Sequence, residues 1–188
     1  MPKLILVKHS LPTLDPAAPA ASWRLAPEGL RRCRALAEHL RAYAPGQIVS
    51  SAEPKAQATA SAVADALAMP WRVAEGLEEH HRRSAPFLAD EAFRQAVAAM
   101  FDRPGELVFG EETADQAAAR FGRAVDALAQ PAPADPLVVV AHGTVIALHL
   151  ARRAGVAPFP LWSRLGLPSF VSVELPSYAI GAVVEHVL

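Results

Sequence analysis

Cysteine, net charge and long apolar runs are all scarce in this sequence of 188 residues. The single cysteine, Cys33, cannot form an internal disulfide, and no apolar stretch approaches the roughly 20 residues that a membrane-spanning helix needs. The N-terminus also lacks the charged and then apolar layout of a signal peptide. We therefore expect a cytoplasmic protein that has no membrane partner.

The charges nearly cancel, since 18 Lys and Arg residues face 19 Asp and Glu residues. A nucleic-acid-binding surface needs a basic field, so we expect no nucleic-acid partner. Metal-binding patterns are also missing: His80 and His81 are adjacent, but there is no HExxH motif and no Cys/His pattern with ligand spacing. We expect no metal, and no pattern in the sequence indicates an oligomeric state.

Two predicted strands end directly in a histidine. Apolar residues 4–7 are followed by Lys-His-Ser at 8–10, and apolar residues 137–141 are followed by His142 and Gly143. In an open α/β sheet, ligands bind beyond the carboxyl ends of the strands. We therefore expect both histidines to face one crevice there.

The remaining pattern alternates helices with strands. Capping residues and apolar periodicity predict five helices. Three lie between Pro27 and Gly46, between Pro54 and Pro70, and over Asp90–Phe101. A fourth runs from a Thr113/Gln116 capping box to Leu128, and a fifth covers Thr144–Arg153 and is ended by Gly155. Strands are predicted over residues 4–7, 47–51, 71–73, 137–141, 170–175 and 181–187, the last two as a hairpin or edge pair. Residues 11–23 and 158–168 are expected to be irregular.

Residues 137–141 are continuously apolar, which is typical of a central parallel strand covered on both faces. We therefore predict an α/β fold in three layers, with a mostly parallel sheet and helices on both of its faces. A single domain is expected to span residues 1–188, and residues 80–112 to form a small helical cap inserted into it.

Finer expectations concern individual side chains. Leu30, Cys33, Ala37 and Leu40 are predicted to share the inward face of the helix that starts at Pro27, and Ser51 to cap the following helix. Most side chains of the charged run at residues 76–83 are expected to be solvated. The tryptophans are expected to serve packing rather than ligand stacking; they are Trp23, Trp71 and Trp162.

Lys55 lies in the first turn of a predicted helix, where a cation is locally unfavourable but where an anion binds well. Together with Lys8 and the two histidines it would form a compact cationic pocket suited to a phosphoryl group. A neutral imidazole can attack phosphorus, and a nearby carboxylic acid, Glu78 or Glu79, can protonate the departing oxygen.

The same segments carry a family resemblance. LILVKHS resembles the strand ending in Arg-His-Gly of the histidine phosphatase superfamily, which includes the phosphoglycerate mutase-like enzymes. LAPEGLRRCRALAEHL, IVSSAEPKAQATA, GLEEHHR, GEETADQAAARF and VVVAHGT resemble, in the family's order, its first helix, its second phosphate-binding segment, its acid loop, a later helix start and its second-histidine strand. The ordered set extends over nearly the whole chain.

The resemblance implies a metal-independent phosphatase, without a cofactor, that hydrolyses a small phosphorylated substrate. His9 would become phosphorylated, His142 would orient the phosphoryl group, and Glu79, picked over Glu78 by the family's spacing, would donate the proton. Phosphate would be bound by Lys8, Lys55, Ser10 and Gly143.

The sequence also departs from the family. Lys8 and Lys55 stand where arginine is usual, which keeps the charge but loses the planar fork that grips phosphate. Ser10 replaces a glycine close to the substrate, and Ala26 replaces a helix-capping threonine. These departures keep two alternatives open: a phosphate-ligand binding or regulatory protein with weak or no turnover, and a phosphomutase.

Overall fold

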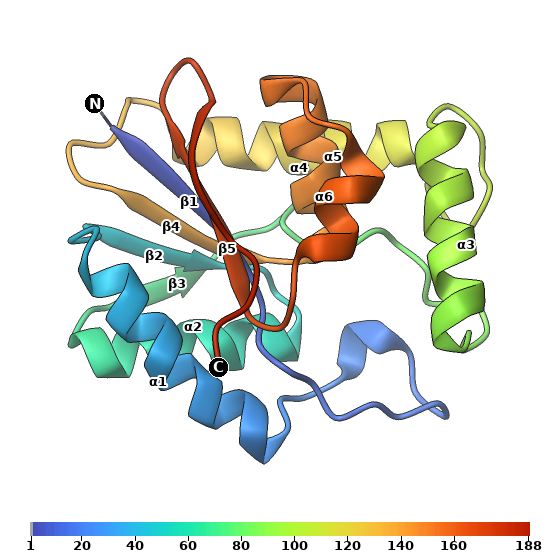
Figure 1. Ribbon diagram of the computed structural model, residues 1–188, viewed down its shortest axis with the longest axis horizontal. Coiled ribbons are helices and arrows are strands. Elements are labelled where there is room, and N and C mark those ends of the chain that lie inside the picture. The colour runs from blue at the N-terminus through green and yellow to red at the C-terminus, as the bar shows by residue number, and fades with distance from the viewer. Residues whose placement is uncertain (1) are drawn as a thin grey trace.

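The computed structural model describes residues 2–188, which form one six-stranded sheet in the order β3-β2-β4-β1-β5-β6 (Figure 1). Strands β1, β2, β3 and β4 pair in parallel, whereas β5 pairs antiparallel with both β1 and β6. The strands are β1 (Lys3–Lys8), β2 (Gln47–Ser50), β3 (Trp71–Val73), β4 (Leu137–Ala141), β5 (Ser169–Glu174) and β6 (Ala179–Val184). The sheet is thus mostly parallel, with an antiparallel hairpin at one edge.

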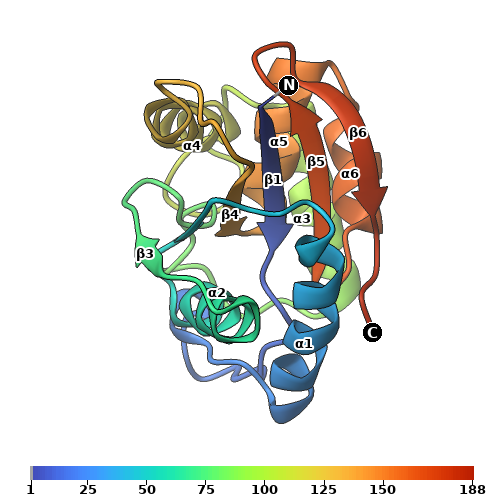
Figure 2. The ribbon, with the colours of Figure 1, turned by 90° about the vertical axis from the view of Figure 1, so that its left-hand side faces the viewer.

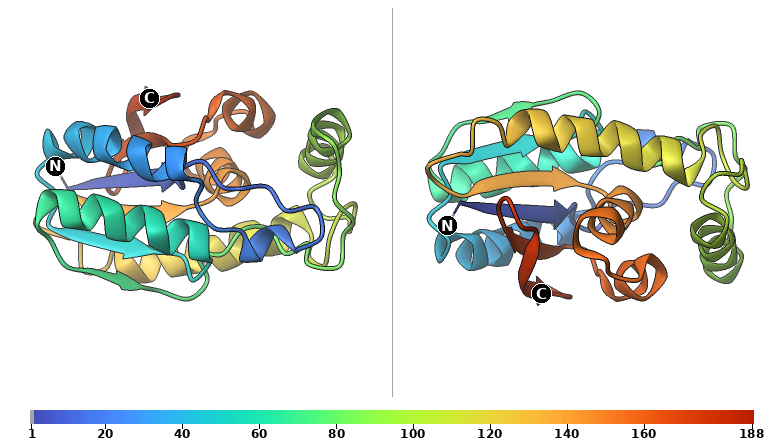
Figure 3. Two further views of the ribbon diagram at one scale, coloured as in Figure 1. Left: turned by 90° about the horizontal axis from the view of Figure 1, so that it is seen from below. Right: turned by 90° about the horizontal axis from the view of Figure 1, so that it is seen from above.

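Helices cover both faces of the sheet (Figures 2 and 3). On one face lie α1 (Pro27–Arg41) and α2 (Pro54–Leu67), and on the other lie α4 (Ala114–Leu128), α5 (Gly143–Ala154) and α6 (Pro158–Arg164). Helix α3 (Asp90–Asp102) stands apart, beyond the carboxyl ends of the parallel strands. The predicted three-layer α/β class is therefore confirmed. Among residues 2–188 no helix is both long and apolar enough to cross a bilayer.

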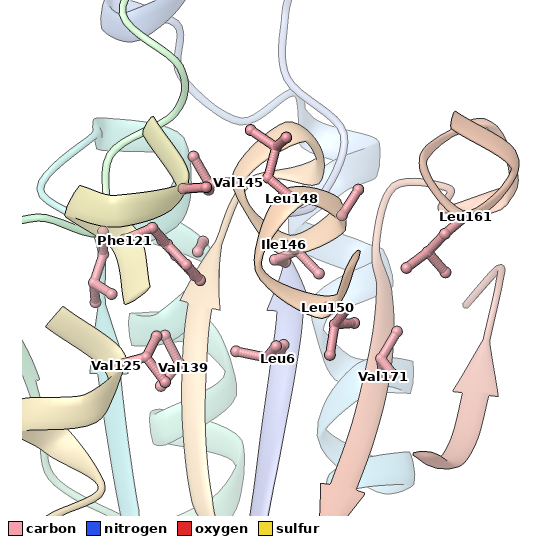
Figure 4. Packing of buried hydrophobic residues seen from close by; sticks show 14 of the residues in the cluster. Leu6, Phe121, Val125, Val139, Val145, Ile146, Leu148, Leu150, Leu161 and Val171 are labelled. Atoms are coloured by element: carbon pink, nitrogen blue, oxygen red, sulfur yellow. The ribbon is translucent and has the colours of Figure 1, made fainter. Parts of the chain in front are cut away.

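Alternating strand residues supply the two halves of the core. Leu4 and Leu6 pack toward α4 and α5, whereas Ile5 and Val7 pack toward α1 and α2. Figure 4 shows the first half: side chains of α4 and α5 lie over Val139 and Leu6 of the sheet, and Leu161 of α6 lies on the side of Val171. All of β4 is buried, as its apolar run predicts, and burial of each such aliphatic side chain stabilises the fold by about 1.5–3 kcal/mol.

Several local predictions are confirmed. Thr113 and Gln116 form the reciprocal capping box, with hydrogen bonds of 2.8 and 3.1 Å, and α4 follows. Gly155 ends α5 with a left-handed backbone, φ 69°, which glycine adopts without steric cost. The final two strands form the predicted hairpin.

Three local predictions are wrong. Residues 158–164 form helix α6 rather than an irregular segment, because Pro158 lies at its first turn, where the missing N–H is not needed. Leu30 is 48% exposed, and Leu36 takes its place on the inward face of α1. Ser51 does not cap α2, whose N-cap is Glu53; the Ser51 hydroxyl is used in the site described below.

Residues 11–26, which we call the strap, run beyond the carboxyl ends of β1 and β2 (Figure 1). Hydrogen bonds close its base: Thr13 N donates to Arg24 O over 2.9 Å, and Ala26 N donates to Leu11 O over 3.0 Å. Helix α1 approaches this base so closely that a Cβ on Gly29 would lie 2.2 Å from Leu11 O. The strap is therefore a clasped loop, with a short 3₁₀ helix at Ala20–Ser22.

Candidate active site

His9 and His142 lie side by side although 133 positions separate them in the chain. Each follows the end of a parallel strand, and β1 and β4 are neighbours in register, with Lys8 opposite Ala141. The His9 backbone N–H donates to Ala141 O over 3.0 Å, which continues the ladder by one step. The two ring centroids are 5.2 Å apart at an interplanar angle of 60°. The structure thus brings the two histidines together, but only His9 lines the cavity described below, whereas His142 is fully buried.

A backbone contact fixes the tautomer of His9. Its Nδ1 lies 2.8 Å from the carbonyl oxygen of Ser10, and because a carbonyl can only accept, Nδ1 carries the hydrogen. Burial, followed by the charges of His142 and Lys55, holds the pKa of His9 well below its ordinary value. His9 is therefore a neutral imidazole whose Nε2 keeps its lone pair.

His142 is fully buried beside His9. Its Nε2 lies 2.8 Å from the hydroxyl of Ser51, which itself accepts the Glu53 N–H over 3.3 Å. Its Nδ1 has no hydrogen-bond partner among residues 2–188. Burial, followed by the charge of Lys55, holds the pKa of His142 well below its ordinary value, against a smaller opposing effect of Glu79.

Lys8 lies under the start of α5. Its stem packs on Gly143, where a Cβ would lie 3.1 Å from Lys8 Cε, and its Nζ donates to Leu165 O over 2.6 Å. Burial lowers the pKa of Lys8 to about 8, although the nearby Glu79 carboxylate opposes that shift. A side chain at position 143 would displace this lysine from the site.

Lys55 lies in the first turn of α2, as predicted, and its side chain is buried. Its ammonium group donates to Ala20 O of the strap over 2.7 Å and forms an ion pair with Glu53. Glu53 in turn accepts the backbone N–H of Glu79 over 2.8 Å. The second lysine therefore does not stand alone as a cation, because a buried carboxylate accompanies it.

Glu79 faces the amino end of α5. Its carboxylate accepts the backbone N–H groups of Thr144 and Val145 over 3.2 and 3.3 Å, where the helix carries partial positive charge. Burial alone would raise the pKa of Glu79, but the charges of Arg82 and His142 outweigh burial and leave the pKa below its ordinary value. In the free site Glu79 is therefore ionised at neutral pH.

The neighbouring acid, Glu78, points elsewhere. Its carboxylate lies 3.6 Å from Arg120 of α4. The same guanidinium donates to the carbonyl oxygens of Gly76, Glu78 and Glu79 over 3.0, 2.9 and 3.1 Å, and so fixes the course of this loop. Of the two candidate acids, the structure brings only Glu79 into the cavity with His9.

A cavity of about 560 Å³ opens above these groups. Its polar floor consists of Lys8, His9, Lys55, Glu79, Gly143 and Thr144. Ser10, expected to bind phosphate, does not line the cavity: its hydroxyl donates to Gly29 O over 2.8 Å and its backbone N–H to Thr59 over 3.0 Å. This serine joins β1 to α1 and α2 instead.

Sequence reasoning missed some residues of the site and misplaced others. Glu53 was not considered, and Arg82, expected to be solvated, lines the cavity with its guanidinium 4.9 Å from the centroid of Phe93. Trp23 and Trp162 line the cavity too, contrary to the expectation of packing alone. The sequence holds one signal for Glu53: it is an acidic residue only two positions before Lys55.

The expectation of a solvated loop is also wrong for His80, which is 2% exposed. Its Nε2 lies 2.7 Å from the carbonyl oxygen of Glu112, in the segment that leads into α4. His81, by contrast, is partly exposed, with its Nδ1 3.7 Å from the Glu112 carboxylate. Within residues 2–188, no three His, Cys, Asp or Glu side chains gather in a way that could hold a metal ion.

The site combines a neutral imidazole, two ammonium groups, a guanidinium, the amino end of a helix and the carboxylates of Glu53 and Glu79. Such a donor-rich and mostly cationic arrangement suits an anion with several oxygens, and a lone pair on His9 Nε2 adds a nucleophile. These are the kinds of group that phosphoryl transfer uses.

The chain belongs to the histidine phosphatase superfamily (branch 1), whose family model matches residues 18–178. The fold and the paired histidines agree with that membership, and the arrangement is that of the phosphoglycerate mutase-like proteins. None of the curated proteins matches the chain.

Solved structures with the same fold include several phosphatases. A mycobacterial glucosyl-3-phosphoglycerate phosphatase, in complex with VO3, superimposes with a TM-score of 0.80 at 22% identity, covering 98% of this chain and 99% of that one. Phosphoserine phosphatase from Entamoeba histolytica, in complex with 3-phosphoglyceric acid, superimposes with a TM-score of 0.78 at 17% identity, covering 98% of this chain and 97% of that one. Bacillus stearothermophilus YhfR superimposes with a TM-score of 0.77 at 20% identity, covering 98% of this chain and 96% of that one.

Proposed function

We propose that this protein is a metal-independent phosphatase that hydrolyses a small phosphomonoester through a phosphohistidine on His9. One observation carries the proposal: the rings of His9 and His142 lie 5.2 Å apart, and His9 lines a cavity together with Lys8, Lys55 and Glu79. Family membership and the phosphatases of the same fold support it.

In the first step, His9 Nε2 attacks phosphorus, and the bond from phosphorus to the ester oxygen breaks. The Ser10 carbonyl holds the hydrogen on Nδ1, so that the attacking nitrogen is the one with the lone pair. Lys8, Lys55 and the N–H of Gly143 stabilise the charge on the equatorial oxygens. Nδ1 of His142, which has no partner among the described residues, donates to one of them.

Glu79 gives its proton to the departing ester oxygen. Its pKa is low in the free site, but a bound phosphoryl group adds negative charge beside it, and like charge favours the protonated acid. Substrate binding thus draws a proton from solvent onto the Glu79 carboxylate, and this is the proton that the ester oxygen receives. In the second step the Glu79 carboxylate takes a proton from water, the water oxygen attacks phosphorus, the bond from His9 to phosphorus breaks, and inorganic phosphate leaves.

The test is hydrolysis of 4-nitrophenyl phosphate by the purified protein in the presence of a chelator. We expect release of inorganic phosphate, an acid-labile phosphoryl group on the protein during turnover, and loss of both in His9→Ala. His39→Ala, an exposed histidine on α1, is the matched control and keeps full activity. Turnover that survives His9→Ala, or that requires a metal, contradicts the proposal.

A second candidate function is favoured by the engagement of both ammonium groups. Glu53 offsets the charge of Lys55, and Lys8 already donates one hydrogen bond to Leu165 O over 2.6 Å, so both ammonium groups are less available to an anion than free lysines would be. Such a site suits a protein that binds a phosphate ester without efficient turnover. Calorimetric binding of a phosphate ester, with no phosphate released over hours, would favour this second function.

A further inference from the structure

The cavity is larger and more apolar than a phosphoryl group requires. A volume of about 560 Å³ falls within the range of roughly 300–1,000 Å³ typical of pockets that take drug-sized ligands. The polar groups of the floor gather around His9, and apart from Arg82, Arg83 and Asp90 the walls are mainly carbon. Once phosphate occupies the floor, the rest of the cavity remains for the alcohol part of the ester.

Aromatic rings from three parts of the chain form these walls. Trp23 of the strap lies 6.4 Å from Phe87, centroid to centroid. On α3 and α6, Phe93 lies 5.8 Å from Trp162, and Phe93 also lies 6.2 Å from Phe109. All five rings line the cavity, at separations typical of edge-to-face and tilted aromatic contacts. A further ring entering between them would find partners of the same kind.

The strap presents few hydrogen-bonding groups to the cavity. The Trp23 indole N–H is already donated to Asp15 O and Ala18 O, over 3.0 and 3.2 Å, so the ring presents carbon to the cavity. Prolines at 12, 16 and 19, which have no N–H to donate, line the same wall. An ammonium or carboxylate group placed against this wall would lose hydration without gaining a hydrogen bond.

Apolar surface at the mouth is also left open to water. Leu14 is 57% exposed and Phe87 is 47% exposed, and both line the cavity. Arg82 lies over the Phe93 ring, and the other two charged groups of the upper wall, Arg83 and Asp90, have opposite signs. The walls thus carry one net positive charge and are otherwise an apolar and aromatic surface that a ligand can cover.

We propose that the substrate of this phosphatase is a phosphomonoester whose alcohol carries an aromatic ring, and that Trp23, Phe87, Phe93, Phe109 and Trp162 hold that ring. The proposal rests on the phosphatase function above and specifies its substrate class. The phosphoryl group sits on the polar floor with the ester oxygen toward Glu79, and the ring stands between the strap and α3.

The experiment compares kcat/KM for 2-phenylethyl, hexyl and ethyl phosphate and for phosphoserine. The alcohols of the first three esters have similar acidity, so differences among them report on binding of the organic group rather than on leaving-group chemistry. The hydroxyl of serine is more acidic, which favours phosphoserine and makes a lead of the phenyl ester over it a stricter test. We expect 2-phenylethyl phosphate to exceed ethyl phosphate and phosphoserine at least tenfold, and hexyl phosphate at least threefold. A hexyl ester that equals the phenyl ester, or a polar ester that leads, overturns the aromatic assignment while leaving the phosphatase function intact.

No turnover of any of these esters or of 4-nitrophenyl phosphate would instead overturn the phosphatase function itself. The aromatic site is then still tested by binding, because benzylphosphonate should bind at least tenfold more tightly than methylphosphonate. Equal binding of the two phosphonates would overturn the aromatic site in either case.

A pair of variants tests whether the aromatic walls cause the preference for the phenyl ester. Phe87→Ala changes a half-exposed side chain, so the fold should survive, and we expect the preference for 2-phenylethyl over ethyl phosphate to fall at least threefold. Leu107→Ala, 63% exposed and outside the cavity, is the matched control and should leave the preference unchanged. A preference that is equal in Phe87→Ala and in the unchanged protein would place the ring elsewhere and refute the assignment.

Discussion

The carboxylate of Glu53 and the ammonium group of Lys55 form a buried ion pair at the start of α2, with their side chains 7% and 5% exposed. The other oxygen of Glu53 accepts the backbone N–H of Glu79 over 2.8 Å. One carboxylate thus joins Lys55 to the loop that carries Glu79. It also places a negative charge close to where an anion would bind.

Glu53→Gln should therefore strengthen inhibition by inorganic phosphate or vanadate, by about tenfold or ~1.4 kcal/mol. Glutamine removes the opposing charge and keeps one oxygen, which can accept from Lys55 or from the Glu79 N–H but not from both, because its amide NH2 takes the place of the other oxygen. The measurement is the inhibition constant at pH 7 and low ionic strength. Glu38→Gln, which changes an exposed acid on α1, is the control and should leave the constant unchanged. Weaker inhibition in Glu53→Gln would mean that the charge is needed to hold Lys55 in place.

The pKa of Lys8, about 8, predicts how phosphate affinity depends on pH. Lys8 is protonated at pH 7 and loses its proton as the pH rises through 8, so inhibition by phosphate should weaken by up to about tenfold between pH 8 and pH 9. Lys8→Arg keeps its charge in this range and should flatten the profile. Lys3→Arg, at the other end of β1, is the control and should leave the pH profile unchanged. If phosphate inhibition weakened equally with pH in the unchanged protein, in Lys8→Arg and in Lys3→Arg, Lys8 would be excluded as the source of the pH dependence.

Glu79→Gln should slow hydrolysis in proportion to how poor the leaving group is. The quantity compared is kcat/KM, which reports the first step alone, because the second step also uses Glu79 and is common to all substrates. An alkyl ester needs a proton on its oxygen, so its kcat/KM should fall about 10²- to 10⁴-fold, whereas that of 4-nitrophenyl phosphate, which leaves as a stable anion, should fall far less. Glu78→Gln, whose parent carboxylate lies by Arg120, is the matched control and should affect both substrates alike. Equal losses for both substrates in Glu79→Gln would show that Glu79 is not the proton donor.

His149 predicts a pH dependence of stability that is separate from the active site. It is 1% exposed on α5, between Phe121 and Tyr178, and its Nε2 has no partner among the described residues. Burial, followed by the charge of Arg153 and against a smaller effect of Asp126, lowers its pKa to about 4.

The unfolded chain binds this proton near pH 6.5 and the folded chain only near pH 4, so stability should fall as the pH drops through that interval. The expected loss is about 2 kcal/mol between pH 7 and pH 5. Urea unfolding of the unchanged protein and of His149→Leu checks it, because other titrating groups cancel in the difference. A difference that does not vary with pH would contradict the prediction.

The predictable part of the fold was the part that local pattern determines. The apolar run of β4, the capping box before α4 and Gly155 after α5 each leave a signature within a few residues, and each element appeared as expected. Helix α6 was missed because proline was taken to exclude a helix, whereas at the first turn its missing N–H costs nothing.

Of the site residues, the sequence predicted best the positions of those that directly follow a strand. His9 and His142 follow adjacent strands, so a sheet rule was enough to bring them together. Ser51 misled because a serine before a helix usually caps it, while here its hydroxyl contacts a histidine 91 positions away. Trp23 and Trp162 became neighbours of the cavity only through the arrangement of the strap and α6, which no local pattern encodes.

The clasped base of the strap has a thermodynamic consequence. A loop whose ends are joined by hydrogen bonds from Thr13 to Arg24 and from Ala26 to Leu11 holds its shape before a ligand arrives. An incoming ester therefore need not immobilise a disordered segment, and less of its interaction energy is lost to ordering entropy. Association should accordingly be limited by encounter rather than by loop rearrangement, with a rate linear in ligand concentration.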